Sequence, residues 1–403
     1  MAGRPFTVLV FAHECAPHNR PESIIAAQRP AQFAKYLPEF GWRAIVLCCD
    51  AKQRRTAIGK DLFDMAAGAR RALAEADVNN SVIIPTPSLQ SDGTIDRLWW
   101  AMQSDRKHPV RRLARRPLTA AKFLSGDYSQ SWQPCARAAA AAIAEEVKID
   151  LCIGEHSPDA GLYLARWFSE NYGVPWLADF RDPILQPIER YARPVYKPIA
   201  RRLLATASCT IQVNPTWAEM DQTLWRIPSH AIPNGFDPEE FAAPNEYQPN
   251  EKLTIAYVGN LIESQRMETF LEGLALLGRE LSAADRSHLL FCYRGGAHEK
   301  VAAWSVKLGV SDLVESEGRV ERSRALRLAK QADLLLLLSI NNPENEDVYF
   351  RHGYYPAKTF EYFGARRPII CVPGDGGLLD ALIRETRTGV ILRAPRDVAD
   401  YLR

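Results

Sequence analysis

A lysine and a glutamate, one helical turn apart in an aromatic-rich segment, are the most specific chemical feature of the chain. The segment, residues 353–367, reads GYYPAKTFEYFGARR. Pro356 suits the first turn of a helix, so we expect the backbone N–H groups of Ala357 and Lys358 at the helix end that binds anions. Lys358 is then placed to neutralise a diphosphate, and Glu361 to accept hydrogen bonds from a sugar hydroxyl.

Glycine-containing turns follow three apolar runs in the second half of the chain. Ligands of open parallel sheets bind beyond the carboxyl ends of the strands, so these turns are candidate binding elements. Glycine lets the backbone approach a ligand closely, and a helix that follows offers free N–H groups to a phosphate. The alternative is a purely structural turn. The candidates are Gly259 and Asn260, then Arg294 with Gly295 and Gly296, then Gly318 with Arg319 and Val320.

A histidine follows the apolar run DLCIG in the first half of the chain. A strand in that run places His156 at its carboxyl end, facing a cleft. Because the unperturbed pKa of histidine lies near physiological pH, His156 could position or deprotonate an acceptor hydroxyl. The alternative is that His156 only caps or packs against the next helix.

Charged residues cluster after the apolar run VPWLA, in the segment ADFRDPI. The cluster consists of Asp179, Arg181 and Asp182. Either Arg181 pairs with one of the two aspartates and shapes an acceptor pocket, or Asp182 binds the acceptor or the donor directly. In the loop after the first apolar run and the helix that follows, Ser23 and Arg29 are further candidates for contact with acceptor or phosphate.

Short apolar, β-rich runs alternate with helical patterns along the chain. This alternation predicts βαβ units and hence α/β domains, each with a doubly wound parallel sheet. The pattern restarts at KLTIAYVGN after a cluster of turn-forming residues, IPNGFDP. We therefore predict two Rossmann-like domains, residues 1–231 and 232–403, with an irregular insertion at about 87–134 in the first.

Length, charge and cysteine usage exclude several classes of protein. The 403 residues suit two domains, and a formal net charge of +2 argues against a nucleic-acid-binding protein. We expect a cytoplasmic protein, because the first apolar stretch is too short for a signal peptide and no run could span a bilayer. The eight cysteines, without a C-x-x-C pair, are expected to be buried, reduced thiols. The final DVADYLR looks like the start of a helix, so we expect that a C-terminal segment has been removed.

A basic run, residues 106–116, lies within the predicted insertion close to Trp99 and Trp100. Basic and aromatic side chains together favour an anionic membrane surface. Peripheral contact at the inner face of a membrane would suit a polyprenyl-linked acceptor. The alternative is a solvated helix face.

Five segments resemble glycosyltransferase family 4 and its relatives in the GT-B superfamily, over nearly the whole chain. In order, they read ADFRDPI, VNPTWAEM, IPNGFDPEEF, YVGNLIES and PAKTFEYFGARRPII. The resemblance implies two Rossmann-like domains facing a central cleft, with the nucleotide mainly on the C-terminal domain and the acceptor mainly on the N-terminal one. It also implies retention of anomeric configuration and no metal or other cofactor.

The resemblance assigns roles to single residues. Glu361 resembles the second glutamate of the family's E-x7-E motif, whose carboxylate holds the nucleotide ribose. The first glutamate, which contacts the donor sugar, would stand where this chain has Gly353. The candidates to replace it are Glu344, Glu346 and Asp347.

The resemblance also assigns contacts to the diphosphate and the base. Arg266 is the nearest match to the family's basic residue after the first strand of the C-terminal domain, and Lys358 is a second diphosphate candidate. The alternative for both is a solvated surface charge. Backbone groups around Arg319 and Val320 match the place where the family holds the base.

We therefore expect a retaining, metal-independent glycosyltransferase of polysaccharide or related biosynthesis. It would move a sugar from a nucleotide-diphosphate donor, of UDP or GDP type, to a glycan, polyprenyl-lipid or small-molecule acceptor. Two alternatives share the fold: a sugar-nucleotide epimerase, and a degenerate binding protein suggested by Gly353. A Rossmann dehydrogenase is disfavoured because no G-x-G-x-x-G follows the first apolar run.

Overall fold

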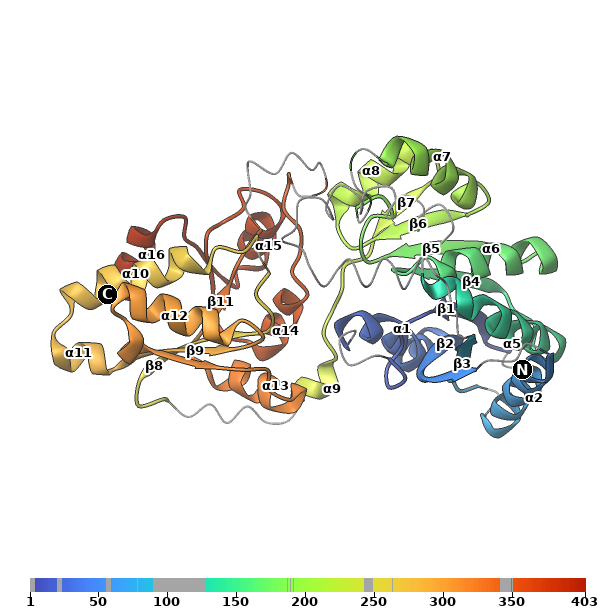
Figure 1. The fold of residues 1–403 in the computed structure, drawn as a ribbon, viewed down its shortest axis with the longest axis horizontal. Helices are drawn as coiled ribbons and strands as arrows, with labels where there is room; N and C mark the ends of the chain where they lie inside the picture. The colour runs from blue at the N-terminus through green and yellow to red at the C-terminus, as the bar shows by residue number, and fades with distance from the viewer. Residues whose placement is uncertain are drawn as a thin grey trace, which may run out of the picture. The chain divides into compact units, whose positions relative to one another are not determined.

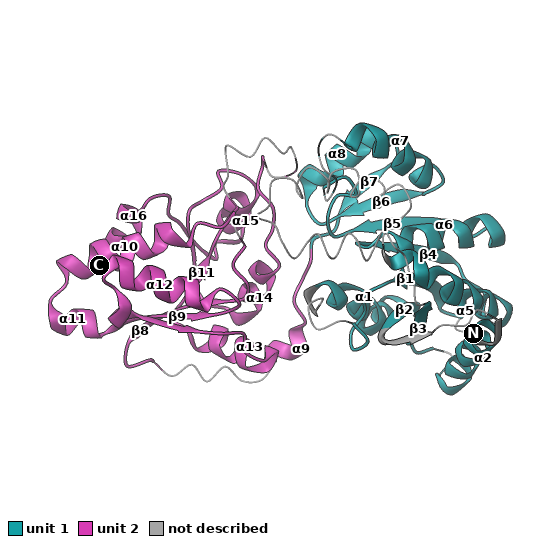
Figure 2. Cartoon of the chain, in the orientation of Figure 1, with its two compact units in different colours: residues 1–233 teal, residues 234–403 magenta. Residues whose placement is uncertain are grey.

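The computed structural model describes residues 4–19, 24–55, 59–77, 79–89, 128–186, 188, 190, 192–242, 249–262, 264–340, 349 and 351–403. The chain forms two compact units, Met1–Pro233 and Asn234–Arg403, called unit 1 and unit 2 (Figure 2). The division falls close to the boundary expected after residue 231. Outside the described residues lie the expected membrane-contact segment, residues 106–116 with Trp99 and Trp100, and also Ser23, Glu344, Glu346 and Asp347.

Unit 1 is a seven-stranded parallel sheet flanked by helices (Figure 1). Its strands are β1 (Phe6–Ala12), β2 (Trp42–Arg55), β3 (Val82–Leu89), β4 (Leu151–His156), β5 (Trp176–Phe180), β6 (Cys209–Gln212) and β7 (Ser229–Ala231). Its helices are α1 (Ile24–Tyr36), α2 (Gly59–Glu75), α5 (Gln133–Glu146), α6 (Ala160–Tyr172), α7 (Arg193–Leu204) and α8 (Pro215–Trp225). The strand order is β3-β2-β1-β4-β5-β6-β7. Successive strands are added toward one edge from β1 to β3 and toward the other edge from β4 onward, as in a doubly wound fold.

Unit 2 repeats this plan with six parallel strands in the order β10-β9-β8-β11-β12-β13. The strands are β8 (Leu253–Val258), β9 (Leu289–Arg294), β10 (Val314–Glu317), β11 (Leu334–Leu337), β12 (Ile369–Cys371) and β13 (Gly389–Ile391). The helices are α9 (Pro238–Phe241), α10 (Met267–Glu280), α11 (Ala283–Ser287), α12 (His298–Leu308), α13 (Arg322–Gln331), α14 (Lys358–Ala365), α15 (Leu378–Thr386) and α16 (Pro395–Leu402). Here the order reverses between β8 and β11.

Alternating residues of the unit 2 strands pack into two separate cores. Ile255 and Tyr257 of β8 join one cluster of buried residues, whereas Ala256 between them joins the other. Helices α10, α12 and α16 cover one face of the sheet, and α13 and α14 cover the other (Figure 1). Because both faces are covered, the strands read as continuous apolar runs, which made them visible in the sequence.

The segment predicted to be an irregular insertion, residues 87–134, forms regular secondary structure at both of its ends. Its first residues belong to β3 and its last to α5, and Trp132 between them is fully buried. The indole Nε1 of Trp132 donates to the hydroxyl of Thr86 at 2.7 Å. The apolar run SVIIP indicated the start of this strand, whereas Pro85 and Pro87 hid its continuation to Leu89. Proline is tolerated here because β3 is an edge strand.

Helix α6 lies directly on the strand pair β1 and β4 through two glycines. A Cβ at Gly161 would lie 2.4 Å from the carbonyl oxygen of Glu155 and 2.5 Å from that of Phe11. A Cβ at Gly154 would lie 2.7 Å from the carbonyl oxygen of Gly161. Backbone contact this close is possible only without side chains. The two glycines thus set the height of α6 above the carboxyl ends of β1 and β4.

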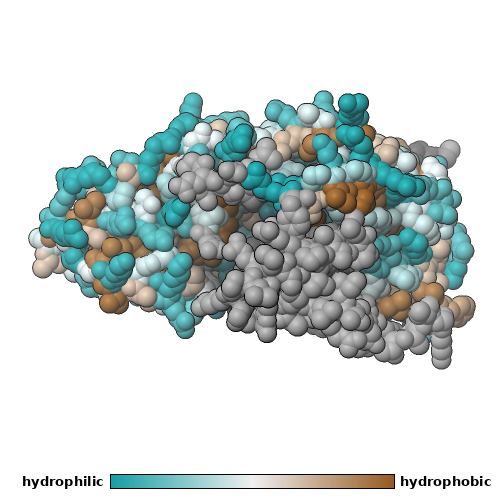
Figure 3. Space-filling model, turned by 45° about the horizontal axis from the view of Figure 1, so that its top comes forward, coloured by the Kyte–Doolittle hydropathy of each residue, from teal (hydrophilic) through white to brown (hydrophobic). Residues whose placement is uncertain are grey.

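The cysteines and the surface agree with a stable globular chain. All eight cysteines, each within the described residues, are free thiols, and seven of them are buried. Large exposed hydrophobic residues such as Phe40, Phe63 and Val306 lie on separate elements. On the face drawn in Figure 3, hydrophilic and hydrophobic residues are intermixed over the described part. None of the described helices has the length and apolar character needed to cross a membrane.

We predict that Gly161→Ala destabilises the chain by about 1–3 kcal/mol or more, because the added methyl group overpacks the junction of α6 with β1 and β4. The matched control is Gly68→Ala in α2, where a Cβ would meet nothing within 4 Å. That exposed substitution should be neutral or stabilising by up to about 1 kcal/mol. Urea unfolding of both variants measures the difference, and equal stabilities would contradict the close contact.

Candidate functional site

The carboxyl ends of three unit 2 strands are tied together by backbone hydrogen bonds. The N–H of Gly259 donates to the carbonyl of Arg294 at 2.9 Å, and the N–H of Gly295 donates to that of Glu317 at 3.0 Å. A Cβ at Gly295 would lie 2.1 Å from the carbonyl oxygen of Gly259, and Gly259 itself has a φ of +124°. Both positions therefore require glycine. The three turns expected from the sequence lie side by side at one edge of the sheet.

Side chains from these turns also meet. The Nε of Arg319 donates to the Oδ1 of Asn260 at 3.2 Å. A Cβ at Gly296 would lie 3.1 Å from the same oxygen, so the glycine keeps space for this contact. Arg319 is exposed and Val320 is half-buried beside it. The structure thus brings together Asn260, Arg319 and the backbone of Val320, as the sequence suggested.

Arg294 has a different position from the one expected of a ligand-binding residue. Its side chain is 8% exposed and forms ion pairs with Glu315 at 2.9 Å and Glu317 at 3.0 Å. It also donates to the carbonyl oxygens of Tyr293 and Glu315. These contacts tie β9 to β10, so we assign Arg294 a structural role.

Lys358, the first residue of α14, carries an ammonium group that forms no ion pair with any of the described residues. The Nζ atom is buried and has no hydrogen-bond partner among the described residues. It lies 3.5 Å from the centroid of the Tyr257 ring, and 3.2 Å from the place where Gly259 would carry a Cβ. Burial lowers the pKa of Lys358 to about 7, although the charge of Glu361 partly opposes this. An anion at the Gly259 turn would supply what this ammonium lacks.

Two tyrosines fix Lys358 against the end of β8. The hydroxyl of Tyr257 donates to the carbonyl of Asn260 at 3.0 Å, which joins the ring below the ammonium to the next turn. Tyr362 follows Lys358 one helical turn later, and its hydroxyl accepts from the N–H of Val258 at 3.2 Å. The start of α14, with Ala357 as its N-cap residue, is thereby fixed next to Gly259.

Glu361, the residue expected to hold a ribose, is paired with an arginine that the sequence did not reveal. The Nη1 of Arg322 donates to the Oε1 of Glu361 at 2.7 Å. The same guanidinium forms two bonds to Glu240, at 2.8 and 2.7 Å. The hydrogen bond to Glu240 outweighs burial and, with the charge of Glu361, raises the pKa of Arg322. This ion triad joins α9, α13 and α14 and leaves about a third of the Glu361 side chain exposed.

Arg266 is the N-cap residue of α10 at the end of the loop that follows Gly259. The preceding Gln265 fixes the loop, since its amide donates to Leu338 at 3.0 Å and accepts from Tyr257 at 3.1 Å. The side chain of Arg266 is exposed and makes no ion pair within the described ranges. Its guanidinium is thus available at the same edge of the sheet as Lys358.

The position of Gly353 is shared with a carboxylate from another element. A Cβ at Gly353 would lie 1.9 Å from the Oδ2 of Asp375, and the glycine has a φ of +76°. Asp375 accepts from the N–H groups of Gly377, Leu379 and Asp380 at 2.7, 3.0 and 3.1 Å. A glutamate at position 353 would collide with this carboxylate. Asp375 therefore occupies the space that a side chain at position 353 would need.

The carboxyl edge of unit 1 carries two buried ion pairs. Arg29 of α1 binds Asp179 through two hydrogen bonds of 2.8 Å, and the side chain of Asp179 is fully buried. Arg181 forms its ion pair with Glu155, whereas one of the two alternatives drawn from the sequence paired it with Asp179 or Asp182. Burial raises the pKa of Glu155 to about 7 in spite of the charge of Arg181. That alternative was wrong because Glu155 of β4, distant in sequence, lies beside Asp179 of β5 in the sheet, and Asp179 is already bound by Arg29.

Asp182 differs from its neighbours, since its side chain is exposed, although its charge contributes to raising the pKa of Arg181. It follows the buried pairs at the carboxyl end of β5. The structure therefore leaves Asp182 available to a ligand.

His156 ends β4, as predicted, but is only 2% exposed. Its Nδ1 lies 2.8 Å from the Oδ1 of Asp159, and Tyr196 donates from its hydroxyl to the other oxygen of this carboxylate. Burial alone would raise the pKa of Asp159, but the contacts with His156 and Tyr196 outweigh it and lower the pKa. The Nε2 of His156 has no hydrogen-bond partner in the part of the chain described. Asp159 thus orients the ring and leaves Nε2 for another group.

Sequence comparison places the chain in no group. No protein-family model matches it, and no curated protein matches its sequence.

The described residues contain no cluster of three or more histidine, cysteine or acidic side chains that could hold a metal ion.

Solved structures are similar to almost the whole chain at low sequence identity. The N-terminal domain of Candida albicans trehalose-6-phosphate phosphatase superposes with a TM-score of 0.61 and 12% identity, covering 100% of this chain and 90% of its own. A glycosyltransferase from Rickettsia africae ESF-5 gives 0.55 and 13%, covering 99% and 88%. Anabaena HepE in complex with UDP gives 0.52 and 12%, covering 98% and 89%. The chain therefore has the GT-B fold of two Rossmann-like domains.

We predict that Lys358→Met stabilises the chain most at about neutral pH and below, where the buried ammonium is charged. Because the pKa of Lys358 is lower in the folded than in the unfolded chain, the unfolded chain binds more protons between these two values and stability rises with pH there. The melting temperature of the variant should exceed that of the parent by at least about 2 °C near pH 6.5. The difference should disappear near about pH 10. A pH-independent difference would contradict the buried, charged state, and Lys307→Met at an exposed site is the control.

Proposed function

We propose that the chain is a glycosyltransferase, and that unit 2 binds a nucleoside diphosphate sugar at the edge that carries Lys358. The observation that carries this proposal is the buried ammonium of Lys358, which lies against the Gly259 turn and forms no hydrogen bond or ion pair with a described residue. A diphosphate has the charge and size to approach a glycine turn and pair with this group.

The same residues would assist departure of the diphosphate. Negative charge grows on the leaving diphosphate as the glycosidic bond to the sugar breaks, and cations held in place beforehand stabilise it. Lys358 is fixed by Tyr257 and Tyr362, and Arg266 adds a second, exposed guanidinium at this edge. Because these groups supply the positive charge, we propose a reaction that needs no metal and no other cofactor.

Glu361 and the turns would hold the nucleoside. Arg322 fixes one oxygen of the Glu361 carboxylate, and the exposed part of the side chain can accept from ribose hydroxyls. The base would lie on the backbone of Arg319 and Val320, next to the hydrogen bond between the side chains of Arg319 and Asn260. We propose UDP or GDP as the nucleotide; the similarity to a structure of HepE with UDP favours UDP.

The donor sugar would lie near Asp375, whose carboxylate occupies the space above Gly353. In glycosyltransferase family 4, which the chain resembles, a glutamate at position 353 would contact the sugar. Asp375 offers a carboxylate at the same place from the start of α15. We propose that Asp375 takes over this contact, so that Gly353 does not make the chain degenerate.

Unit 1 would bind the acceptor at the carboxyl ends of β4 and β5. The Nε2 of His156 could accept the proton of an acceptor hydroxyl, with Asp159 orienting the ring. Asp182 is an exposed group for binding the acceptor. We propose retention of anomeric configuration and a glycan, polyprenyl-lipid or small-molecule acceptor at the cytoplasmic side of a membrane, in polysaccharide or related biosynthesis.

The experiment that tests this function is calorimetric titration of the purified chain with UDP, GDP and ADP in the absence of metal. We expect saturable binding of one nucleotide, weakened about tenfold or more by Lys358→Met because a charge-assisted bond is lost. Lys307→Met, at an exposed site of α12, should bind like the parent. Binding of none of the nucleotides, or equal binding by Lys358→Met, would overturn the proposal.

A second prediction separates the ribose contact from the diphosphate contact. Glu361→Gln should weaken binding of the preferred nucleotide about tenfold or more, because a charged acceptor for the ribose hydroxyls is lost. It should not weaken binding of an analogue that lacks both ribose hydroxyls. Glu272→Gln on the exposed side of α10 is the matched control. Equal losses for nucleotide and analogue would contradict the ribose assignment.

A further inference from the structure

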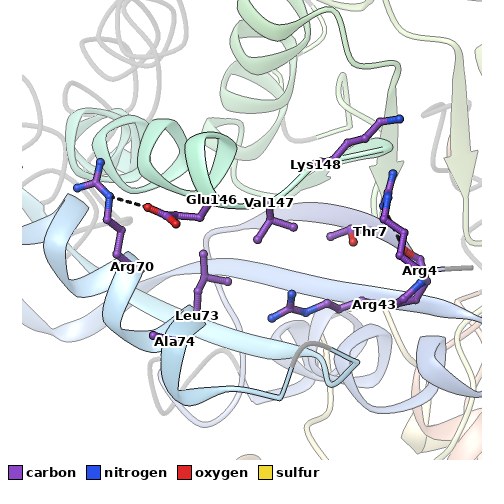
Figure 4. A pocket seen from close by; sticks show the side chains of 10 residues that line it. Arg4, Thr7, Arg43, Arg70, Leu73, Ala74, Glu146, Val147 and Lys148 are labelled. Atoms are coloured by element: carbon purple, nitrogen blue, oxygen red, sulfur yellow. Dashed lines mark hydrogen bonds and ion pairs between the residues drawn. The ribbon is translucent and has the colours of Figure 1, made fainter.

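A pocket of about 500 Å³ opens at the amino edge of the unit 1 sheet, at the opposite strand ends from His156. Figure 4 shows its walls, which come from the starts of β1 and β2, the second half of α2 and the segment that follows α5. Its volume lies in the range of pockets that bind small molecules. The residues proposed to bind the donor and the acceptor do not line this pocket. It is therefore separate from the proposed substrate sites.

Arg43 at the start of β2 points into this pocket. The residue is 4% exposed, and its Nε donates to the carbonyl of Asn80 at 2.9 Å. Its Nη2 is buried and has no hydrogen-bond partner among the residues described. In Figure 4 the guanidinium extends from β2 toward Leu73 and Val147. Strand pairing with Thr7 of β1 fixes the backbone behind it.

The other basic side chains around the pocket either form ion pairs with carboxylates or point away from the pocket. Arg4 binds both oxygens of Asp150, at 2.8 and 2.7 Å. Arg70 pairs with Glu146 at 3.3 Å and also contacts Glu145. The exposed Lys148 points away from the other lining residues in Figure 4. Among the cations that line the pocket, Arg43 is therefore the one with a buried terminal nitrogen, Nη2, that has no hydrogen-bond partner within the described part.

A buried guanidinium nitrogen without a partner, such as the Nη2 of Arg43, is unusual, because nearly all buried polar groups in proteins have partners. Burial lowers the pKa of Arg43, although the charge of Asp77 partly opposes this. The guanidinium nevertheless stays protonated. The wall around it is largely apolar and is formed by Pro5, Leu73, Ala74 and Val147. The pocket therefore combines an unpaired charged donor of Arg43 with an apolar wall, and its rim carries the paired charges of Arg4, Arg70 and Glu146.

We propose that this pocket binds a small molecule that carries one oxyanion, a carboxylate or a phosphate, on a short apolar body. The planar guanidinium matches the geometry of both oxyanions. The apolar wall contributes through the area that it removes from water. Such a ligand binds independently of the nucleotide site on unit 2.

The test is calorimetric titration of the full chain with hexanoate, hexyl phosphate and inorganic phosphate. We expect saturable binding of at least one hexyl probe, about tenfold or more tighter than inorganic phosphate, because only the hexyl probes fill the apolar part. A preference for hexanoate identifies a carboxylate ligand, and a preference for hexyl phosphate identifies a phosphate ligand. Absence of saturable binding by both hexyl probes would overturn the proposal.

Three variants locate the binding. Arg43→Gln and Ala74→Trp should each weaken the preferred probe about tenfold or more, the first by removing the charged donor and the second by filling the pocket. Arg71→Gln, on α2 but outside the pocket lining, should leave binding unchanged. Ala74 is exposed, so its variant remains informative if Arg43→Gln fails to fold. Unchanged binding by folded Ala74→Trp would also overturn the proposal.

Discussion

A buried ammonium group, which no described residue pairs directly, is the constraint around which the candidate site of unit 2 is arranged. Moving a charge out of water is costly unless another charge or a hydrogen bond replaces the lost hydration. The ring of Tyr257, 3.5 Å from the Nζ of Lys358, supplies part of this stabilisation. The remaining free-energy cost of burying the ammonium is offset by the other contacts of the fold. A bound anion would lower this cost.

The surrounding contacts follow from the need to hold this group in place. Gly259 leaves room for the lysine tip, and Tyr362 ties α14 to the end of β8. Arg322 links α14 to α9 and α13 through Glu361 and Glu240, so the helix that carries Lys358 is fixed on both sides. The pKa of Lys358, about 7, means that its charge responds to pH and to a bound anion in the physiological range.

The sequence could predict the parts of this site that depend on local pattern. Apolar runs followed by glycines located the turns at Gly259 and Gly295, and proline before a helix located the start of α14. The sequence could not predict Arg322 or Asp375, because each meets its partner through the fold, Arg322 across 39 residues to Glu361. Arg294 was misjudged for the same reason, since its carboxylate partners lie on the neighbouring strand. In unit 1, Pro85 and Pro87 concealed the second half of β3, which tolerates both prolines because it is an edge strand.

The most direct test of the account is an NMR titration of the Lys358 side chain, assigned by comparison with Lys358→Met, with and without the nucleotide that binds. The account predicts a pKa of about 7 in the free chain, because burial of the ammonium outweighs the opposing charge of Glu361. It also predicts that a saturating nucleoside diphosphate raises this pKa, because the bound anion supplies the missing charge. An ordinary lysine pKa in the free chain, unchanged by the nucleotide, would contradict it.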